Sequence, residues 1–196
     1  MNRILKMTLL GLLFTGLAAL PVFALPTANT GYIYIGDSRF AYMDNDLAFS
    51  SAPNVFNVSV PGEGYWWLTN IAQPFISNIK QSNPQITTWY EIYNLGVNDL
   101  ASIDYYVQYY QNRALFNRVV LVSVNPVENC NRADNPSIEY FNSRLRATNL
   151  AYIDCYSYLR STAYGTYDGI HYTPETNRAI YNYIDSSMTL YTAAVK

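Results

Sequence analysis

Histidine, cysteine and charged residues are scarce in this chain of 196 residues. It contains one histidine and two cysteines, and only 13% of its residues are charged. One imidazole and two separated thiols do not form a ligand cluster, so the sequence gives no support for a metal site, and we expect no cofactor. With 12 Lys and Arg residues against 14 Asp and Glu residues, the chain lacks the basic excess that phosphate backbones require. Nucleic acid is therefore not an expected partner.

Only one stretch of the chain is apolar over a long distance, and it lies near the N-terminus. Residues 7–20 are almost entirely apolar, follow two basic residues and are succeeded by small residues. This pattern is typical of a signal peptide at residues 1–24, cleaved after Ala24. The alternative is an uncleaved membrane anchor, although the run is shorter than the roughly 20 residues that span a bilayer. We expect a secreted, extracellular protein with residues 25–196 as one domain, and no membrane span after cleavage.

The two cysteines of an exported chain can form a disulfide. A bond between Cys130 and Cys155 would close a loop of moderate length and stabilise the fold by about 3 kcal/mol. The alternative is a pair of free, buried thiols, because the sequence gives no distance between the two residues.

Short β-rich runs alternate with longer helical patterns from residue 31 onward. The strands are expected at residues 32–35, 55–60, 87–95, 118–124 and 152–155, and the helices at 65–80, 103–116, 135–148 and 175–191. This alternation predicts an α/β protein, a three-layer α/β/α sandwich with a five-stranded parallel sheet of flavodoxin-like topology. A flavin or nucleotide binder with this topology is not favoured, because no glycine-rich phosphate loop follows the first strand.

Polar residues follow the ends of several predicted strands, where parallel sheets place functional groups. Ser38 follows the first strand in Gly-Asp-Ser-Arg, and Asn98 follows the third in Gly-Val-Asn-Asp. The only histidine, His171, lies in Asp-Gly-Ile-His, three residues after Asp168. Singly these residues have structural explanations, such as a helix cap for Ser38 or a buried hydrogen-bonding imidazole. Together they predict a serine nucleophile, a histidine base and an aspartate that orients the base.

In these motifs the chain resembles the SGNH hydrolases, also called GDSL-type esterases and lipases. The resemblance covers about residues 31–191. It implies that Ser38 is the nucleophile and that Asp168 and His171 complete the catalytic triad. It also implies an oxyanion hole made of the Ser38 backbone N–H, a glycine N–H after the second strand and the side-chain amide of Asn98.

The sequence offers more than one candidate for the oxyanion glycine and for the substrate contacts. Gly62 and Gly64 both follow the second strand, and we favour Gly64 because it directly precedes a helical segment. Arg39 follows the serine where many members of the family have leucine, so lipid-like substrates are less expected. Arg39, Trp66 and Asn125 are candidate substrate-binding residues, although an arginine can equally be solvated and a tryptophan can equally be packing.

These observations predict a secreted serine ester hydrolase. It would remove a small acyl group such as acetyl from a carbohydrate or cell-wall polymer through an acyl-serine intermediate, acting as a monomer. The alternatives are a fatty-acyl lipase or thioesterase of the same family, and a non-catalytic carbohydrate-binding module with the same fold.

Overall fold

A parallel sheet of five strands, in the order β2-β1-β3-β4-β5, organises the protein. The structure is a computed structural model and describes residues 29–194. The strands are β1 (Thr30–Gly36), β2 (Val55–Ser59), β3 (Thr88–Asn94), β4 (Arg118–Val122) and β5 (Ala151–Ile153). All neighbouring strands run parallel.

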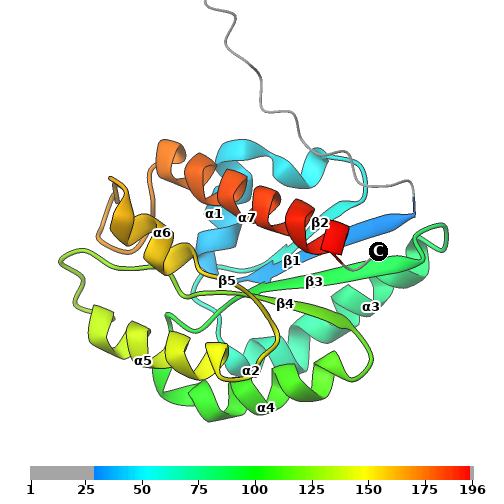
Figure 1. The fold of residues 1–196 in the computed structure, drawn as a ribbon, viewed down its shortest axis with the longest axis horizontal. Coiled ribbons are helices and arrows are strands. Elements are labelled where there is room, and N and C mark those ends of the chain that lie inside the picture. The colour runs from blue at the N-terminus through cyan, green and yellow to red at the C-terminus, as the bar shows by residue number, and fades with distance from the viewer. Residues whose placement is uncertain (1–28, 195–196) are drawn as a thin grey trace, which may run out of the picture.

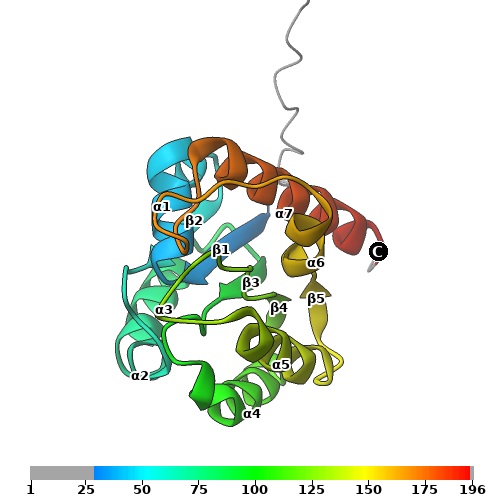
Figure 2. The ribbon, with the colours of Figure 1, turned by 90° about the vertical axis from the view of Figure 1, so that its left-hand side faces the viewer.

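Helices cover both faces of this sheet (Figures 1 and 2). One face carries α1 (Ser38–Leu47), α6 (Cys155–Ser161) and α7 (Pro174–Ala194). The other carries α2 (Tyr65–Trp67), α3 (Gln73–Ser82), α4 (Ile103–Ala114) and α5 (Asn135–Arg146). A π-helical turn, η2 (Leu68–Ala72), joins α2 to α3, and the 3-10 turns are η1 (Phe49–Ser51) and η3 (Leu100–Ser102). The expected three-layer α/β/α sandwich is confirmed.

The alternation of side chains along the strands supplies a hydrophobic core on each face of the sheet. In β1, Ile33 and Ile35 pack toward α2 to α5, whereas Tyr34 between them packs toward α1 and α7. Such strands must be apolar on both sides. This accounts for the near-continuous apolar run of β4, in which four successive residues are buried.

The chain around β5 differs from the expectation. The strand ends at Ile153 rather than at residue 155, and α6 follows at once. Asp154 caps this helix, because its side chain accepts a hydrogen bond of 3.0 Å from the Ser157 N–H. The cap begins a helix where we predicted the end of a strand.

The two cysteines are free, so the expected disulfide is wrong. Cys155 is fully buried in the core beneath α1 and α7, whereas Cys130 packs against the core on the other face of the sheet. A disulfide requires Cα atoms within about 7 Å of each other. The two thiols belong to different hydrophobic cores, one on each face of the sheet.

The expected signal peptide lies outside the described residues, so cleavage and export stay predictions. Within residues 29–194, no helix is long and apolar enough to cross a membrane.

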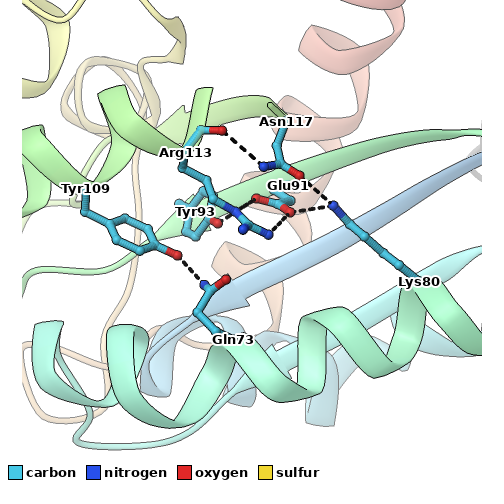
Figure 3. A network of polar contacts seen from close by, with 7 residues as sticks. All are labelled: Gln73, Lys80, Glu91, Tyr93, Tyr109, Arg113 and Asn117. Atoms are coloured by element: carbon cyan, nitrogen blue, oxygen red, sulfur yellow. Dashed lines mark hydrogen bonds and ion pairs between the residues drawn. The ribbon is translucent and has the colours of Figure 1, made fainter. Parts of the chain in front are cut away.

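A buried carboxylate joins β3 to α3 and α4 (Figure 3). The Glu91 side chain has no exposed surface and lies 2.6 Å from the Lys80 Nζ and the Arg113 Nη2. The Arg113 Nε and the Tyr93 hydroxyl also donate to it, at 2.7 and 2.8 Å. Burial alone would raise the pKa of Glu91, but the hydrogen bonds and charges of Arg113 and Lys80 outweigh burial and lower it. The carboxylate therefore stays ionised inside the fold.

Candidate active site

The neighbouring strands β2, β1 and β3 end at the same edge of the sheet, and this brings the loops that follow them together. Gly36 at the end of β1 pairs with Ser59 of β2 on one side and with Asn94 of β3 on the other. The residues that follow these strands therefore leave the same edge of the sheet. Ser38, Gly64 and Asn98 all come within a few residues of that edge, as the positions of their motifs predicted.

The nucleophile candidate lies at the first position of a helix. Helix α1 begins at Ser38, and the carboxylate of Asp37 caps it by accepting a 3.0 Å hydrogen bond from the Arg39 N–H. The Ser38 N–H belongs to the first turn, whose N–H groups have no partner within the helix and point along the positive end of its dipole. Burial raises the pKa of the capping Asp37 to about 6, against the opposing charge of Arg39.

Ser38, His171 and Asp168 form a hydrogen-bonded chain. The His171 Nε2 lies 2.9 Å from the Ser38 Oγ, and the His171 Nδ1 lies 2.7 Å from the Asp168 Oδ2. The other carboxylate oxygen accepts the backbone N–H of His171 at 2.8 Å. Burial acts to raise the pKa of Asp168, but these hydrogen bonds outweigh it and lower the pKa. This is the geometry of a nucleophile, a base and a residue that fixes the tautomer of the base.

Gly169 makes the tight turn between Asp168 and His171 possible. Its φ angle is +84°, a conformation that favours glycine, and a Cβ atom here would lie 1.9 Å from the carbonyl oxygen of Glu128. The Glu128 N–H donates to the Gly169 carbonyl at 2.8 Å. The segment that carries the base is thus attached to the loop after β4.

The segments that carry Gly64 and Asn98 are joined by two hydrogen bonds. The Asn98 Nδ2 donates to the carbonyl of Glu63 at 2.8 Å, and the Tyr65 N–H donates to the Asp99 Oδ2 at 2.8 Å. A primary amide has two N–H donors, so one of those of Asn98 remains for a ligand.

The backbone distinguishes the two candidate oxyanion glycines. A Cβ atom on Gly64 would lie 2.6 Å from the Asp99 carboxylate, whereas nothing lies within 4 Å of such an atom on Gly62. Gly62 has a φ angle of +82° and belongs to the turn closed by the hydrogen bond from Glu63 to Val60. Gly62 is therefore explained by the turn, and Gly64 stays our candidate for the oxyanion hole.

Two of the three candidate substrate-binding residues are in the interior. Arg39 and Asn125 are each only 2% exposed, and the Arg39 Nη1 donates to the carbonyl of Asn125 at 2.8 Å. The guanidinium also lies over the ring of Tyr172, 5.5 Å from its centroid. Both side chains are thus as buried as Ser38, which is 4% exposed, and contact with substrate stays a prediction for Arg39 and Asn125. Arg39 connects the helix of the nucleophile to the loop after β4 and to the neighbour of His171.

Trp66, the third candidate, is exposed. Its side chain is 67% accessible, and it lies two residues after Gly64. Contact with substrate stays a prediction for this residue. Its neighbour Trp67 is buried in the core.

The structure adds a pocket that sequence reasoning missed. A hollow of about 340 Å³ lies beside the candidate base. It is lined by Tyr42, Asn45, Asp46, Tyr167, Asp168, His171 and Tyr172. The signal was present in the sequence, because three of these residues follow Ser38 at intervals of four, seven and eight positions, which is one face of a helix.

Among residues 29–194, no three histidine, cysteine, aspartate or glutamate side chains are grouped as a metal site.

Comparison with known proteins places the fold. No protein-family model matches the chain, and no curated protein matches its sequence. The structure is similar to the lipase/acylhydrolase from Enterococcus faecalis, with a TM-score of 0.56 and 14% identity over 81% of this chain and 95% of that one. It is also similar to a member of the lipolytic G-D-S-L family from Veillonella parvula, with a TM-score of 0.53 and 15% identity over 80% and 97%. The chain has the SGNH-hydrolase fold. Another structure with this fold, the C-terminal catalytic domain of Streptococcus pneumoniae peptidoglycan O-acetyltransferase A with a methylsulfonyl adduct, matches with a TM-score of 0.60 and 17% identity over 87% and 97%.

Proposed function

We propose that the protein is a serine ester hydrolase that removes a small acyl group, most simply acetyl, from a carbohydrate or cell-wall polymer. The observation that carries this proposal is the 2.9 Å contact between the His171 Nε2 and the Ser38 Oγ, with Asp168 on the other ring nitrogen. The SGNH-hydrolase fold supports the reaction class, because a lipase/acylhydrolase shares it. Fold alone does not establish activity, so the proposal depends on the side chains.

The reaction begins with attack of Ser38 on the ester carbonyl. His171 takes the hydroxyl proton, and Asp168 holds the imidazole and stabilises its positive charge. The tetrahedral oxyanion accepts hydrogen bonds from the N–H groups of Ser38 and Gly64 and from the Asn98 amide. Each such donor lowers the barrier by about 3 kcal/mol in other oxyanion holes.

The intermediate then collapses. His171 passes its proton to the alcohol oxygen, the carbon–oxygen bond of the ester breaks, and an acyl-serine remains. A water molecule attacks this acyl group with His171 again as base. Carboxylic acid leaves and the hydroxyl of Ser38 is restored.

The polymer substrate is supported by two observations. One structure with this fold is named as a peptidoglycan O-acetyltransferase domain. The pocket beside His171 contains tyrosine rings and polar side chains, a combination suited to sugars. The same neighbour favours a second candidate, transfer of the acyl group from Ser38 to a sugar hydroxyl instead of water.

Substitution of the nucleophile tests the reaction class. Ser38→Ala should abolish release of p-nitrophenol from p-nitrophenyl acetate and labelling by a fluorophosphonate probe, with an unchanged circular dichroism spectrum. Ser59→Ala is the matched control, since Ser59 is a half-buried serine at the same sheet edge that donates to the Asn57 side chain. Equal turnover by wild type and Ser38→Ala would reject the mechanism, and a wild type that neither turns over nor labels would support the binding module.

A substrate panel tests the finer proposal. Acetylated xylan, acetylated peptidoglycan and p-nitrophenyl esters of increasing chain length should show preferred release of acetate from a polymer. A preference for long acyl chains would indicate a lipase or thioesterase. Appearance of acetylated oligosaccharide instead of free acetate would indicate a transferase.

A further inference from the structure

The pocket beside His171 lies between α1 and the segment of residues 167–172 (Figure 2 shows these two parts side by side). Tyr42 and Asp46 line it from α1, and Tyr167 and His171 line it from the segment. The Tyr42 ring meets the His171 ring edge to face, with centroids 4.7 Å apart. The pocket is thus continuous with the base proposed to act on Ser38.

The reaction determines which portion of the ester lies next to His171. His171 must deliver its proton to the alcohol oxygen as the ester bond breaks, so that oxygen lies against the His171 Nε2. The oxyanion donors Gly64 and Asn98 belong instead to the segments after β2 and β3. The alcohol portion of the ester, rather than its acyl portion, therefore lies next to His171, the residue that the catalytic site shares with the pocket.

The lining of the pocket is negatively charged. Its charged carboxylates are Asp46 and Asp168, and no lysine or arginine of residues 29–194 lines it. One oxygen of Asp46 accepts a 2.6 Å hydrogen bond from the Asn177 Nδ2. That bond holds the carboxylate in place and leaves its other oxygen for a ligand.

Aromatic rings complete the lining. Tyr167 is 71% exposed and Tyr42 is 37% exposed, so both rings are accessible to a bound molecule. Tyrosine faces attract ammonium groups, and nearby carboxylates strengthen that attraction. An anionic alcohol would meet two like charges here.

We infer that this pocket binds the alcohol portion of the ester and selects an alcohol that carries an ammonium group over a neutral or anionic one. This inference rests on the proposed function and adds the class of alcohol to it. A choline-type alcohol and an amino sugar share this chemistry.

Acetate esters whose alcohol portions carry different charges test the selection. The probes are acetylcholine, its neutral analogue 3,3-dimethylbutyl acetate, and anionic 3-acetoxypropane-1-sulfonate. We expect kcat/KM to decrease in that order, with the difference between the first two shrinking as salt screens the charges. O-acetylated glucosamine and its N-acetylated form make a second pair, and a charge preference in only one pair identifies which source the pocket fits.

Variants of the lining provide the second readout. Asp46→Asn removes the charge and keeps an acceptor for Asn177, and should lower the ratio of kcat/KM for acetylcholine over the neutral ester by about threefold to tenfold. Tyr167→Ala should lower the same ratio by about twofold to fivefold. Asp104→Asn is the matched control, because Asp104 is an exposed carboxylate on α4 across the sheet, paired with Arg144. It should leave the ratio unchanged.

The outcomes separate the two proposals. If wild type does not hydrolyse p-nitrophenyl acetate, the proposed function fails. If it does, but the cationic, neutral and anionic esters react equally, the anionic ester reacts fastest, or Asp46→Asn leaves the ratio unchanged, the inference about the alcohol pocket is overturned.

Discussion

The buried carboxylate of Glu91 gives the sharpest test of what holds helices α3 and α4 to the sheet. Glu91→Gln keeps the size of the side chain and removes its charge. Lys80 and Arg113, whose side chains are each only 23% exposed, would then face a neutral amide. The Arg113 Nε, which donates to one carboxylate oxygen at 2.7 Å, would lose a charge-assisted hydrogen bond.

The expected loss of unfolding free energy is about 3 kcal/mol at pH 7. Breaking a fully buried ion pair costs about 3 to 5 kcal/mol. We expect the lower end because both cations keep some contact with water. Urea unfolding followed by tryptophan fluorescence measures this loss.

The difference between wild type and Glu91→Gln should depend on pH. The folded pKa of Glu91 is lowered, so its stabilisation is complete above the pKa of the unfolded chain, about 4.3. It decreases as pH falls from that value through the folded pKa. The difference between the two proteins should therefore narrow below about pH 4.

Asp104→Asn serves as the control for removing a carboxylate. Its pair with Arg144 has side chains that are 75% and 36% exposed, and solvent screens such surface pairs so that they contribute little to stability. If Glu91→Gln is no more destabilising than this control, or if its effect is the same at acid pH, the assignment of Glu91 as the ionised centre of the network is refuted.

Three further predictions follow from the site and the core. Gly169→Ala should lower kcat at least tenfold, because the added Cβ would lie 1.9 Å from a backbone carbonyl oxygen. Gly165→Ala is the control and should keep most activity, because its Cβ would meet only the Thr173 side chain, at 3.2 Å. Equal activities of the two variants would contradict this account. Asp37 has a folded pKa raised by burial to about 6, so its ionisation costs stability as pH rises from about 4 to 6, by up to about 3 kcal/mol. Asp37→Asn removes this cost of ionisation. The difference in unfolding free energy between the variant and wild type, measured in urea, should therefore increase from about pH 4 to pH 6 and then level off. A difference that does not change with pH would argue against the raised pKa. Thiol titration should find two reactive groups in unfolded protein and slow reaction of Cys155 in folded protein, since burial raises the pKa of that thiol; a single disulfide by mass spectrometry would overturn the placement of the cysteines on opposite faces.

The fold was largely predictable because the strands are apolar on both faces. The runs around Ile33 and Val120 cannot belong to strands with one wet face, and their alternation with helical patterns leaves few topologies. The α6 helix was missed for a local reason. A short strand passes directly into a helix at Asp154, and a single capping aspartate is too common to mark that boundary from sequence.

The sequence predicted those parts of the site whose residues belong to recognisable motifs. The contact between Ser38 and His171 followed from motifs at strand ends. The burial of Arg39 and Asn125 was not predictable, because polar residues usually lie at the surface and burial depends on packing that the sequence does not display. The pocket residue Asp46 was missed because helix α1 was recognised only at its first residues.

The hydrogen bond between Ser38 and His171 joins positions that are 133 residues apart. During translation the alcohol emerges early, whereas its proton acceptor is made only after most of the polypeptide exists. Any truncated product that stops before residue 168 therefore contains Ser38 without its proposed base. Under the proposed function, hydrolysis requires almost the whole chain, so the appearance of turnover would report that the molecule is complete and folded.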